Sequence, residues 1–427
     1  MLSDQYDNAI TTTSQAARDH FIEGVDRCLA ADPHHAAPFE AAIAEDPGFA
    51  IAHAGLARAR QFEGDMAGAK AAIQDARATS KHGDTREQSH IHALGLMIDG
   101  KTADAYAAIR AHVDDHPRDA MLAQTCSSVF GLIGFSGKPG REAETLAYVA
   151  GLLPHYGEDW WCLSQYAFAL SENGDQDRAD TTIERSLGLR ARSAHSAHVR
   201  SHIYYEMGET DLGLAYLDDW IAPYDHSAYM HGHLAWHSAL WALETGDVSA
   251  MWQRLDRDID PAVSNSMPIN VLTDMAALLY RAELAGIEVP AARWQTISDY
   301  ALKFFPKTGL GFTDFHAALA HAMAGNGEAL MAIIENPNPV TGDIVTPVAQ
   351  AFREMAAQNW AAGIELLVSA MGDHARLGGS RAQRDLLEFA LLHALLKMGK
   401  DDEARHMLRL RRPALVGTRS VHGLNAH

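Results

Sequence analysis

Apolar residues recur along this chain at helical spacing, in short blocks separated by turn residues. The stretch FAIAHAGLARARQFE before Gly64 and the stretch MAGAKAAIQDARATS after it both place apolar side chains three and four residues apart. This spacing is typical of amphipathic helices, and the small residues of the second stretch let two helices approach closely. No segment shows the sustained alternation of Val, Ile and Thr that predicts a strand. The pattern therefore predicts an all-α protein.

Turn signals built on Gly or Asn repeat at intervals of roughly 34 to 40 residues, which is the period of a helix–turn–helix repeat. They occur at Gly64, Gly100, Gly137, Gly174, Gly208, Gly246, Gly286, Gly325, Asn359 and Gly399. Glycine accommodates the left-handed conformation in which helices commonly end, so we expect a positive φ at these positions. The repeat predicts an α-solenoid of about ten tetratricopeptide-like hairpins, curved into a superhelix with a concave groove.

The two ends of the chain depart from this repeat. Residues 1–40 predict an N-terminal capping helix that breaks at Pro33 and Pro38. The repeats then run through residues 41–412 as a single solenoid domain. After Pro413 the polar, glycine-containing segment 413–427 predicts a disordered tail.

Composition argues against some kinds of partner and some cellular compartments. The chain has 47% hydrophobic residues and a formal net charge of −20, which argues against nucleic acid as a partner because phosphate binding needs clustered Lys and Arg. Its three cysteines form no CxxC pair, and the N-terminus lacks the pattern of a secretory signal. No apolar run is long enough to span a bilayer. We expect a cytoplasmic protein without a membrane partner.

Histidines are concentrated in one part of the chain. Among 24 histidines, two pairs are spaced four residues apart: His198 with His202, and His233 with His237. On a helix, residues four apart lie on the same face. Each pair stands six to thirteen residues before a turn glycine, so we expect both pairs on the first helices of consecutive repeats, which line the groove. The spacing predicts four imidazoles in one space.

Four imidazoles at this spacing suit two kinds of chemistry. They can bind Zn²⁺ or another first-row divalent ion, or they can act as general acid and base near neutral pH without any metal. The alternative is purely structural, with neutral histidines packed between helices and hydrogen-bonded to a carbonyl or carboxylate. Scattered histidines elsewhere, such as His90 and His112, are interpreted as surface or half-buried positions.

Asp314 and His316 fall at an equivalent place before the turn at Gly325. We interpret them as proton-transfer partners of the histidine pairs, and so as further catalytic candidates. A local alternative is that Thr313 caps a helix and Asp314 favours its dipole.

Candidate substrate-binding residues come from two segments. In GGSRAQRDLLEFALLHAL, Arg384 is a partner for an anionic substrate group, although Ser380 and Gln383 also fit a capping box. Trp160, Trp161 and Tyr166 before Gly174 predict an aromatic wall of the groove, although core packing is the commoner use of such residues. The full candidate set is Gln383, Arg384, Asp385, His393, Trp161 and Tyr166.

The chain contains no GxSxG elbow, phosphate-binding loop, dinucleotide fingerprint or HExxH motif. The leading hypothesis is a histidine-rich concave pocket that binds a small molecule, in an enzyme of hydrolase or lyase type that uses either a divalent metal or histidine acid/base catalysis. The alternative is a non-catalytic scaffold that binds a protein or peptide. The candidate lining of His, Trp, Tyr and Asp favours a narrow pocket. The sequence does not indicate the oligomeric state.

Four segments together resemble the tetratricopeptide repeat protein 38 family. They are HVRSHIYYEMGE, HLAWHSALWALETGD, DFHAALA and SRAQRD, which occur in the family's order, and the similarity runs from roughly residue 30 to 412. HVRSHIYYEM is one residue longer between His202 and Glu206 than the family's form. The resemblance implies a solenoid fold and supplies no reaction.

Overall fold

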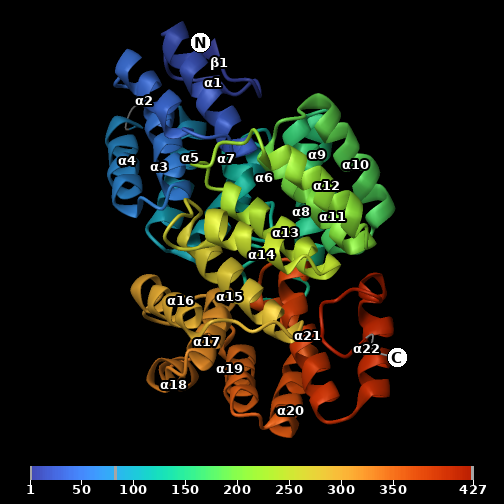
Figure 1. Ribbon diagram of the computed structural model, residues 1–427. Coiled ribbons are helices and arrows are strands. Elements are labelled where there is room, and N and C mark those ends of the chain that lie inside the picture. Colours follow the sequence, from blue (N-terminus) through green and yellow to red (C-terminus); the bar gives the residue numbers. More distant parts are fainter. Residues whose placement is uncertain (1, 81–83, 425–427) are drawn as a thin grey trace. The chain divides into compact units, whose positions relative to one another are not determined.

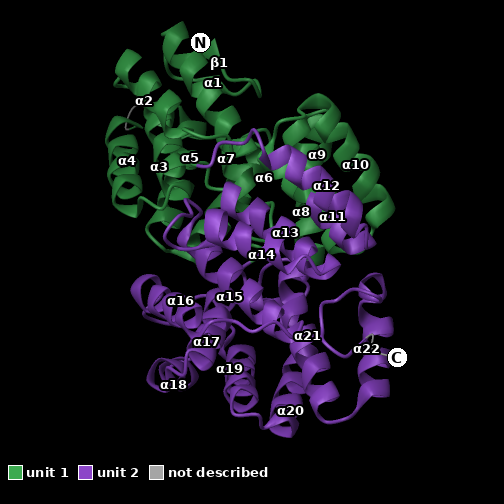
Figure 2. Ribbon diagram, in the orientation of Figure 1, with its two compact units in different colours: residues 1–134, 142–200, 227–230 green, residues 135–141, 201–226, 231–427 purple. Residues whose placement is uncertain are grey.

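The computed structural model describes residues 2–80 and 84–424, which are helical almost throughout (Figure 1). The chain divides into two compact units, coloured separately in Figure 2. Unit 1 contains residues 1–134, 142–200 and 227–230, and unit 2 contains residues 135–141, 201–226 and 231–427. The array expected as one domain over residues 41–412 is therefore divided between two units. None of the described helices is both long and apolar enough to cross a membrane.

Unit 1 begins with two short paired strands, which the sequence pattern did not predict. They are β1 (Leu2–Ser3) and β2 (Ala9–Ile10), antiparallel, and two residues are too few to show an alternating pattern. The capping helix expected within residues 1–40 corresponds to α1, followed by a break and α2. The helices of this unit are α1 (Gln15–Ala30), α2 (Ala36–Glu45), α3 (Ala50–Phe62), α4 (Met66–Thr79), α5 (Thr85–Ile98), α6 (Thr102–Asp115), α7 (Ala120–Ala123), η2 (Gln124–Cys126), α8 (Arg141–Tyr156, whose first residue belongs to unit 2), α9 (Trp160–Glu172) and α10 (Gln176–Leu189).

Successive helices of unit 1 pack as hairpins, with α3 against α4, α5 against α6 and α9 against α10. The turn at Gly64 shows how the sequence sets one of these hairpins. Gly64 takes a φ of 77°, and the Asp65 side chain accepts the backbone N–H of Gly68 at the start of α4. One Gly-Asp pair thus ends one helix and begins the next.

The backbone conformation of the turn residues confirms the prediction of a positive φ at the repeated glycines. The φ values are positive at all nine glycines that the spacing selected, and range from 68° to 87°. At the tenth turn the left-handed residue is Gln358, with a φ of 62°, and Asn359 becomes the cap of the next helix. Hairpin repeats of tetratricopeptide type are therefore the fold class of this chain.

Unit 2 is built around one buried helix. Every residue of α13 from His231 to Glu244 is buried, which is typical of a helix surrounded by others. Helix α15 packs against α13, α17 against α15, and α19 against α17, while α21 returns to contact α15. The helices of this unit are α11 (Ala194–Met207, shared with unit 1), α12 (Thr210–Ile221), α13 (His231–Thr245), α14 (Val248–Arg254), η3 (Leu255–Ile259), α15 (Pro268–Leu284), α16 (Ala291–Phe304), α17 (Gly311–Met323), α18 (Gly327–Glu335), α19 (Gly342–Ala356), α20 (Trp360–Met371), η4 (His374–Leu377), α21 (Arg381–Lys397), α22 (Asp401–Arg411) and η5 (Pro413–Leu415).

The prediction of a disordered tail from residue 413 is wrong as far as Leu424. Leu415, Val421 and Leu424 are buried, and the His422 backbone N–H donates to the Leu284 carbonyl at 2.7 Å. The segment is polar and contains glycine, so its composition did not indicate that these three apolar residues pack against unit 2. Residues 425–427 lie outside the described part of the chain.

Candidate metal centre

Helices α11 and α13 carry the two histidine pairs. They end at turn glycines of positive φ, Gly208 at 74° and Gly246 at 85°. Because four residues are close to one helical turn, each helix presents both of its imidazoles on one face.

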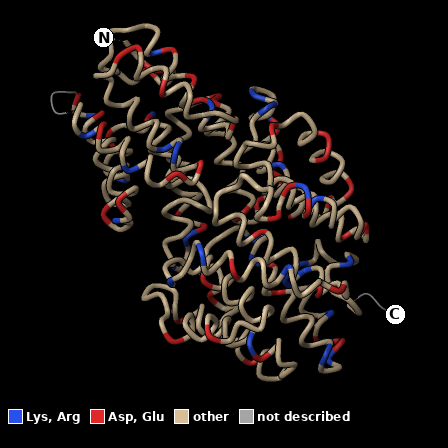
Figure 3. Tube along the Cα trace, turned by 60° about the vertical axis from the view of Figure 1, so that its left-hand side comes forward, with Lys and Arg blue, Asp and Glu red and all other residues tan. Residues whose placement is uncertain are grey.

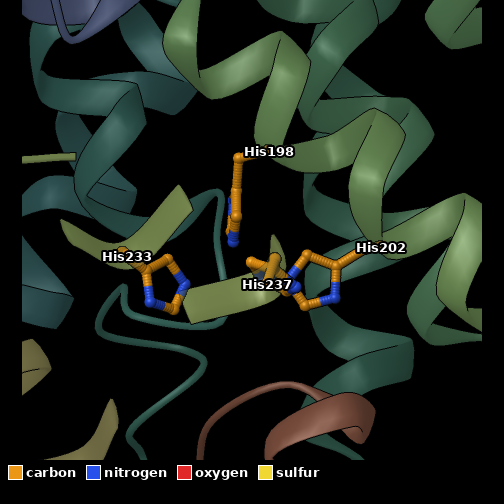
Figure 4. Close-up of side chains that lie close together, drawn as sticks. All are labelled: His198, His202, His233 and His237. Carbon is orange, nitrogen blue, oxygen red and sulfur yellow. The ribbon is translucent and has the colours of Figure 1, made fainter. Parts of the chain in front are cut away.

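The four imidazoles converge, as Figure 4 shows. One ring nitrogen from each of His198, His202, His233 and His237 lies within 4.8 Å of the others. The ring centroid of His237 is 4.6 Å from that of His202 and 5.1 Å from that of His233. His198 precedes the unit boundary, which follows Arg200 inside α11, whereas the other three histidines belong to unit 2. The arrangement predicted from the spacing is thus present.

The three histidines of unit 2 are buried, with exposed fractions of 1% for His202, 4% for His233 and 1% for His237. Burial, together with the neighbouring His233, lowers the pKa of His202 to about 3. Burial also lowers the pKa of His237 well below its usual range, and His202 and His233 add to this effect. His202 and His237 are therefore neutral at pH 7, which is the form of imidazole that binds metal.

Asp274 orients one of these rings. It lies on α15, is 2% exposed, and places Oδ2 2.7 Å from Nδ1 of His233. Burial raises the pKa of Asp274, whereas the adjacent His233 lowers it. When Nδ1–H donates to this carboxylate, the lone pair of the ring lies on Nε2. A carboxylate behind a metal-binding histidine is the usual outer partner in such sites.

A second group of buried polar residues adjoins the histidines. Arg281 on α15 donates to the Tyr205 hydroxyl at 3.4 Å and to the Ala382 carbonyl. The Tyr205 hydroxyl donates to Asp385 at 2.9 Å, and Arg412 contacts the same carboxylate at 2.9 Å. These residues come from four helices or their ends, so helical spacing could not reveal them.

The charge of Arg281 acts on four buried titratable groups: Tyr205, His237, His316 and Glu244. Burial raises the pKa of Glu244 to about 7, and Arg281 opposes that rise. A carboxyl group that titrates near neutral pH is suited to proton transfer. Glu206, by contrast, pairs with Arg412 at 2.7 Å, and this pairing occupies its carboxylate.

Asp314 serves the start of α17. Its carboxylate accepts the Gly309 backbone N–H at 3.1 Å, and burial raises its pKa to about 6. Thr313 is not the N-cap, since α17 begins at Gly311 and the Thr313 hydroxyl donates to the Leu310 carbonyl. Of the two local roles considered for this segment, a cap at Thr313 and a dipole effect of Asp314, only the second applies. The Asp314 carboxylate lies in the first turn of α17, where a negative charge interacts favourably with the helix dipole.

His316 is completely buried, and its Nδ1 lies 2.8 Å from the Phe312 carbonyl. Burial lowers its pKa to about 3, with Arg281 contributing in the same direction. Its Nε2 has no hydrogen-bond partner among the described residues. Arg281 therefore lowers the pKa of both His316 and His237, which is the link between His316 and the histidine group.

The candidates on α21 have different surroundings. Ser380 and Gln383 form the predicted capping box, and Arg384 donates to the Gly379 carbonyl at 2.5 Å. Asp385 belongs to the network of Tyr205 and Arg412 described above. His393 packs its ring 5.5 Å from that of Trp360, and burial lowers its pKa to about 4.

Trp161 and Tyr166 lie on α9 in unit 1. Trp161 is fully buried against Tyr156, with ring centroids 5.3 Å apart, so core packing describes it better than a substrate wall. The Tyr166 hydroxyl accepts a hydrogen bond from Arg178 at 2.5 Å.

The interpretation of His90 and His112 as surface or half-buried positions is wrong. Both are buried in unit 1 and contact Oδ2 of Asp119, at 2.9 Å and 3.1 Å. Arg86 donates to the same oxygen at 2.6 Å. Burial alone would raise the pKa of Asp119, but His90, His112 and Arg86 together hold it well below its usual range. This cluster is a saturated buried ion-pair network.

No protein-family model matches the chain. Among solved structures, similarity was found to a human IFIT1 dimer with m7Gppp-AAAA, at 12% identity and a TM-score of 0.45 over 94% of this chain and 92% of that one. Yeast Tom70 is 13% identical with a TM-score of 0.37 over 93% of this chain and 85% of that one. The TPR domain of P58(IPK) is 14% identical with a TM-score of 0.21 over 93% and 99%.

Proposed function

We propose that this chain is a metal-binding helical-repeat protein in which His202, His233 and His237, joined by His198, hold one divalent first-row ion such as Zn²⁺. The observation that carries this proposal is the pair formed by His233 and Asp274. The carboxylate fixes the ring tautomer and directs Nε2 away from Asp274. The resemblance to the tetratricopeptide repeat protein 38 family stays a prediction.

The chemistry of the donor set fits such an ion. Neutral imidazole nitrogens are preferred ligands of Zn²⁺, with Zn–N distances of about 2.0–2.1 Å. In a tetrahedral site the ligating atoms then lie roughly 3.3–3.4 Å apart. The four nitrogens lie within 4.8 Å of one another, so small rotations of the rings would close the site. Because His202 and His237 are already neutral, binding needs no proton release from them at pH 7.

We further propose a metal-dependent reaction of hydrolase or lyase type on a small molecule. A bound ion of this kind supplies Lewis acidity and lowers the pKa of a bound water. Glu244, with a pKa of about 7, would accept or donate a proton, and Arg281 would pair with an anionic substrate group.

The second candidate is a non-catalytic scaffold that binds a protein or peptide. It is supported by the near-complete burial of His202, His233 and His237, because a closed site with four protein ligands is typical of structural metals, whereas a catalytic site keeps one position open. In this case the ion holds α11 and α13 together, and a partner binds elsewhere on the repeats. Figure 3 shows acidic and basic residues interspersed along the chain.

Metal analysis of the purified protein tests both proposals. We expect about one tightly held ion per chain in the wild type and in a His92→Ala/His155→Ala control, because those two histidines are exposed and outside the cluster. The His233→Ala/His237→Ala variant should hold none at this site. Zinc at a hundred times its Kd should raise the free energy of unfolding of the wild type by about 2.7 kcal/mol.

Equal metal content in the double variant and the wild type would contradict the proposed centre. The catalytic and structural uses are then separated by substituting Glu244→Gln in the loaded protein. Loss of turnover with retained metal supports the enzyme, whereas a zinc-dependent rise in thermal stability without hydrolysis of ester, amide or phosphoester probes supports the scaffold.

A further inference from the structure

A second histidine group lies at the N-terminal end of the buried helix α13, within unit 2. His226 precedes α13, His231 is its first residue, and Asp258 lies in η3, a short π-helical turn. One ligating atom from each residue lies within 4.8 Å of the others. The ring centroids of His226 and His231 are 4.6 Å apart. π-Helical turns are rare and occur often at functional sites.

We propose that His226, His231 and Asp258 form a second divalent transition-metal site, which binds an exchangeable ion such as Zn²⁺, Ni²⁺ or Cu²⁺ at the protein surface. Two imidazoles and one carboxylate are a recurrent donor set for first-row metals with open coordination positions. This site shares no residue with the buried histidine centre, and it stands whether or not that centre binds metal.

The interatomic distances fit one shared ion. Oδ1 of Asp258 lies 3.3 Å from Nε2 of His226 and 3.9 Å from Nδ1 of His231. Two ligands at about 2.0–2.2 Å from one ion are separated by roughly 3.3–3.6 Å in tetrahedral geometry and by no more than about 4.4 Å. Both distances fall in this interval. The second distance is too long for a hydrogen bond.

The burial of the three side chains sets the character of the site. The side chains of His231 and Asp258 are 7% and 0% exposed, and Nδ1 of His231 has no hydrogen-bond partner among the described residues. The His226 side chain is 45% exposed. Two ligands are thus fixed in the protein interior, while the third faces solvent and leaves coordination positions open to water or a small anion.

One cation of the protein already occupies Asp258. The Arg257 guanidinium contacts both carboxylate oxygens at 2.8–3.1 Å, but its side chain is 72% exposed. Because the Arg257 side chain is largely exposed, its guanidinium can move into water without losing hydration, so a divalent ion can displace it from the buried Asp258 carboxylate. In the Asp119 cluster, by contrast, Arg86 is buried and bonds the oxygen that both histidines use. That cluster has no comparable place for an ion.

Calorimetric titration of the metal-free full-length protein with ZnCl₂ at pH 7.5 tests the second site. Substitution His226→Ala should weaken one zinc-binding event at least tenfold and leave any tighter event unchanged. Arg257→Ala should strengthen that same event several-fold, because it removes the competing cation. An exposed histidine far from the cluster in sequence, replaced in His155→Ala, serves as the control and should leave the titration unchanged.

The opposite response to the two substitutions is the deciding result. A structural ion pair without metal would give the same titration for the wild type, His226→Ala and Arg257→Ala, and this outcome would overturn the proposal. Repeating the titration in the His233→Ala/His237→Ala background separates the two sites. The event sensitive to His226→Ala should persist there, even if the buried centre proves to bind no metal.

Discussion

Glu244 offers a direct test of the electrostatics inside unit 2. Its side chain lies on the buried helix α13, is 7% exposed as a residue, and accepts a hydrogen bond from the Thr210 hydroxyl at 3.3 Å. Burial raises its pKa from 4.5 to about 7. The folded state therefore holds one more proton than the unfolded state between these two pH values, and the contribution of Glu244 to stability falls as pH rises through this window.

The size of the effect follows from the shift. A difference of about 2.5 pKa units, at about 1.4 kcal/mol for each unit, gives about 3 kcal/mol by which the ionised carboxylate destabilises the folded state above pH 7. The substitution Glu244→Gln keeps the shape and an acceptor for Thr210 but carries no charge. We therefore expect it to stabilise the metal-free protein by about 3 kcal/mol more at pH 8 than at pH 4.5.

Urea unfolding of both proteins at several pH values between 4.5 and 8 measures this difference. The control is Glu365→Gln on α20, an exposed position where the same substitution should have little effect at either pH. If the stability difference between Glu244→Gln and the wild type stays constant with pH, the carboxylate is not desolvated, and its proposed role in proton transfer fails with it.

Four other substitutions test the site and the fold. Asp274→Ala should weaken zinc binding by about 10- to 100-fold in a competition assay with a chromogenic chelator, because His233 loses the carboxylate that orients it; unchanged affinity would exclude the orienting role. Asp119→Asn should lower the free energy of unfolding, measured in urea at pH 7, by about 3–5 kcal/mol, because it removes the buried charge that compensates Arg86. A loss below about 1 kcal/mol would contradict this ion-pair network. Gly151→Ala lies inside α8 with open space around the new methyl group and should stabilise the protein by about 0.5–1 kcal/mol. Gly100→Ala has equal space but a φ of 76°, and it should destabilise the protein by about 1–2 kcal/mol. Equal effects of the two substitutions on the free energy of unfolding would refute the conformational argument.

Local patterns in the sequence predicted the features that depend on neighbouring residues. The turn at Gly64, the capping box of Ser380 and Gln383, and the helical pairing of His198 with His202 each follow from contacts within a few residues. The meeting of the two histidine pairs also followed from repeat spacing, because the repeat fixes which helices are neighbours.

The partners of these residues could not be predicted in the same way. Asp274 reaches His233 from 41 positions away, and Tyr205 reaches Asp385 across 180 positions. No periodicity links residues at such separations. The sequence around Asp274 alone does not distinguish it from an ordinary polar position of a helix. The packed segment up to Leu424 was missed for a related reason, since its few apolar anchors gain their meaning only from the surface of unit 2 that receives them.

X-ray absorption at the zinc edge tests the buried centre most directly. The sample is a His226→Ala/Asp258→Asn variant loaded with one equivalent of Zn²⁺, so that the second site cannot contribute. We expect zinc–nitrogen distances of about 2.0–2.1 Å with the outer-ring scattering of three or four imidazoles, and loss of that signal in the additional presence of His233→Ala and His237→Ala. A spectrum dominated by oxygen ligands without imidazole scattering, and unchanged by these two substitutions, would contradict a metal centre built from the four histidines.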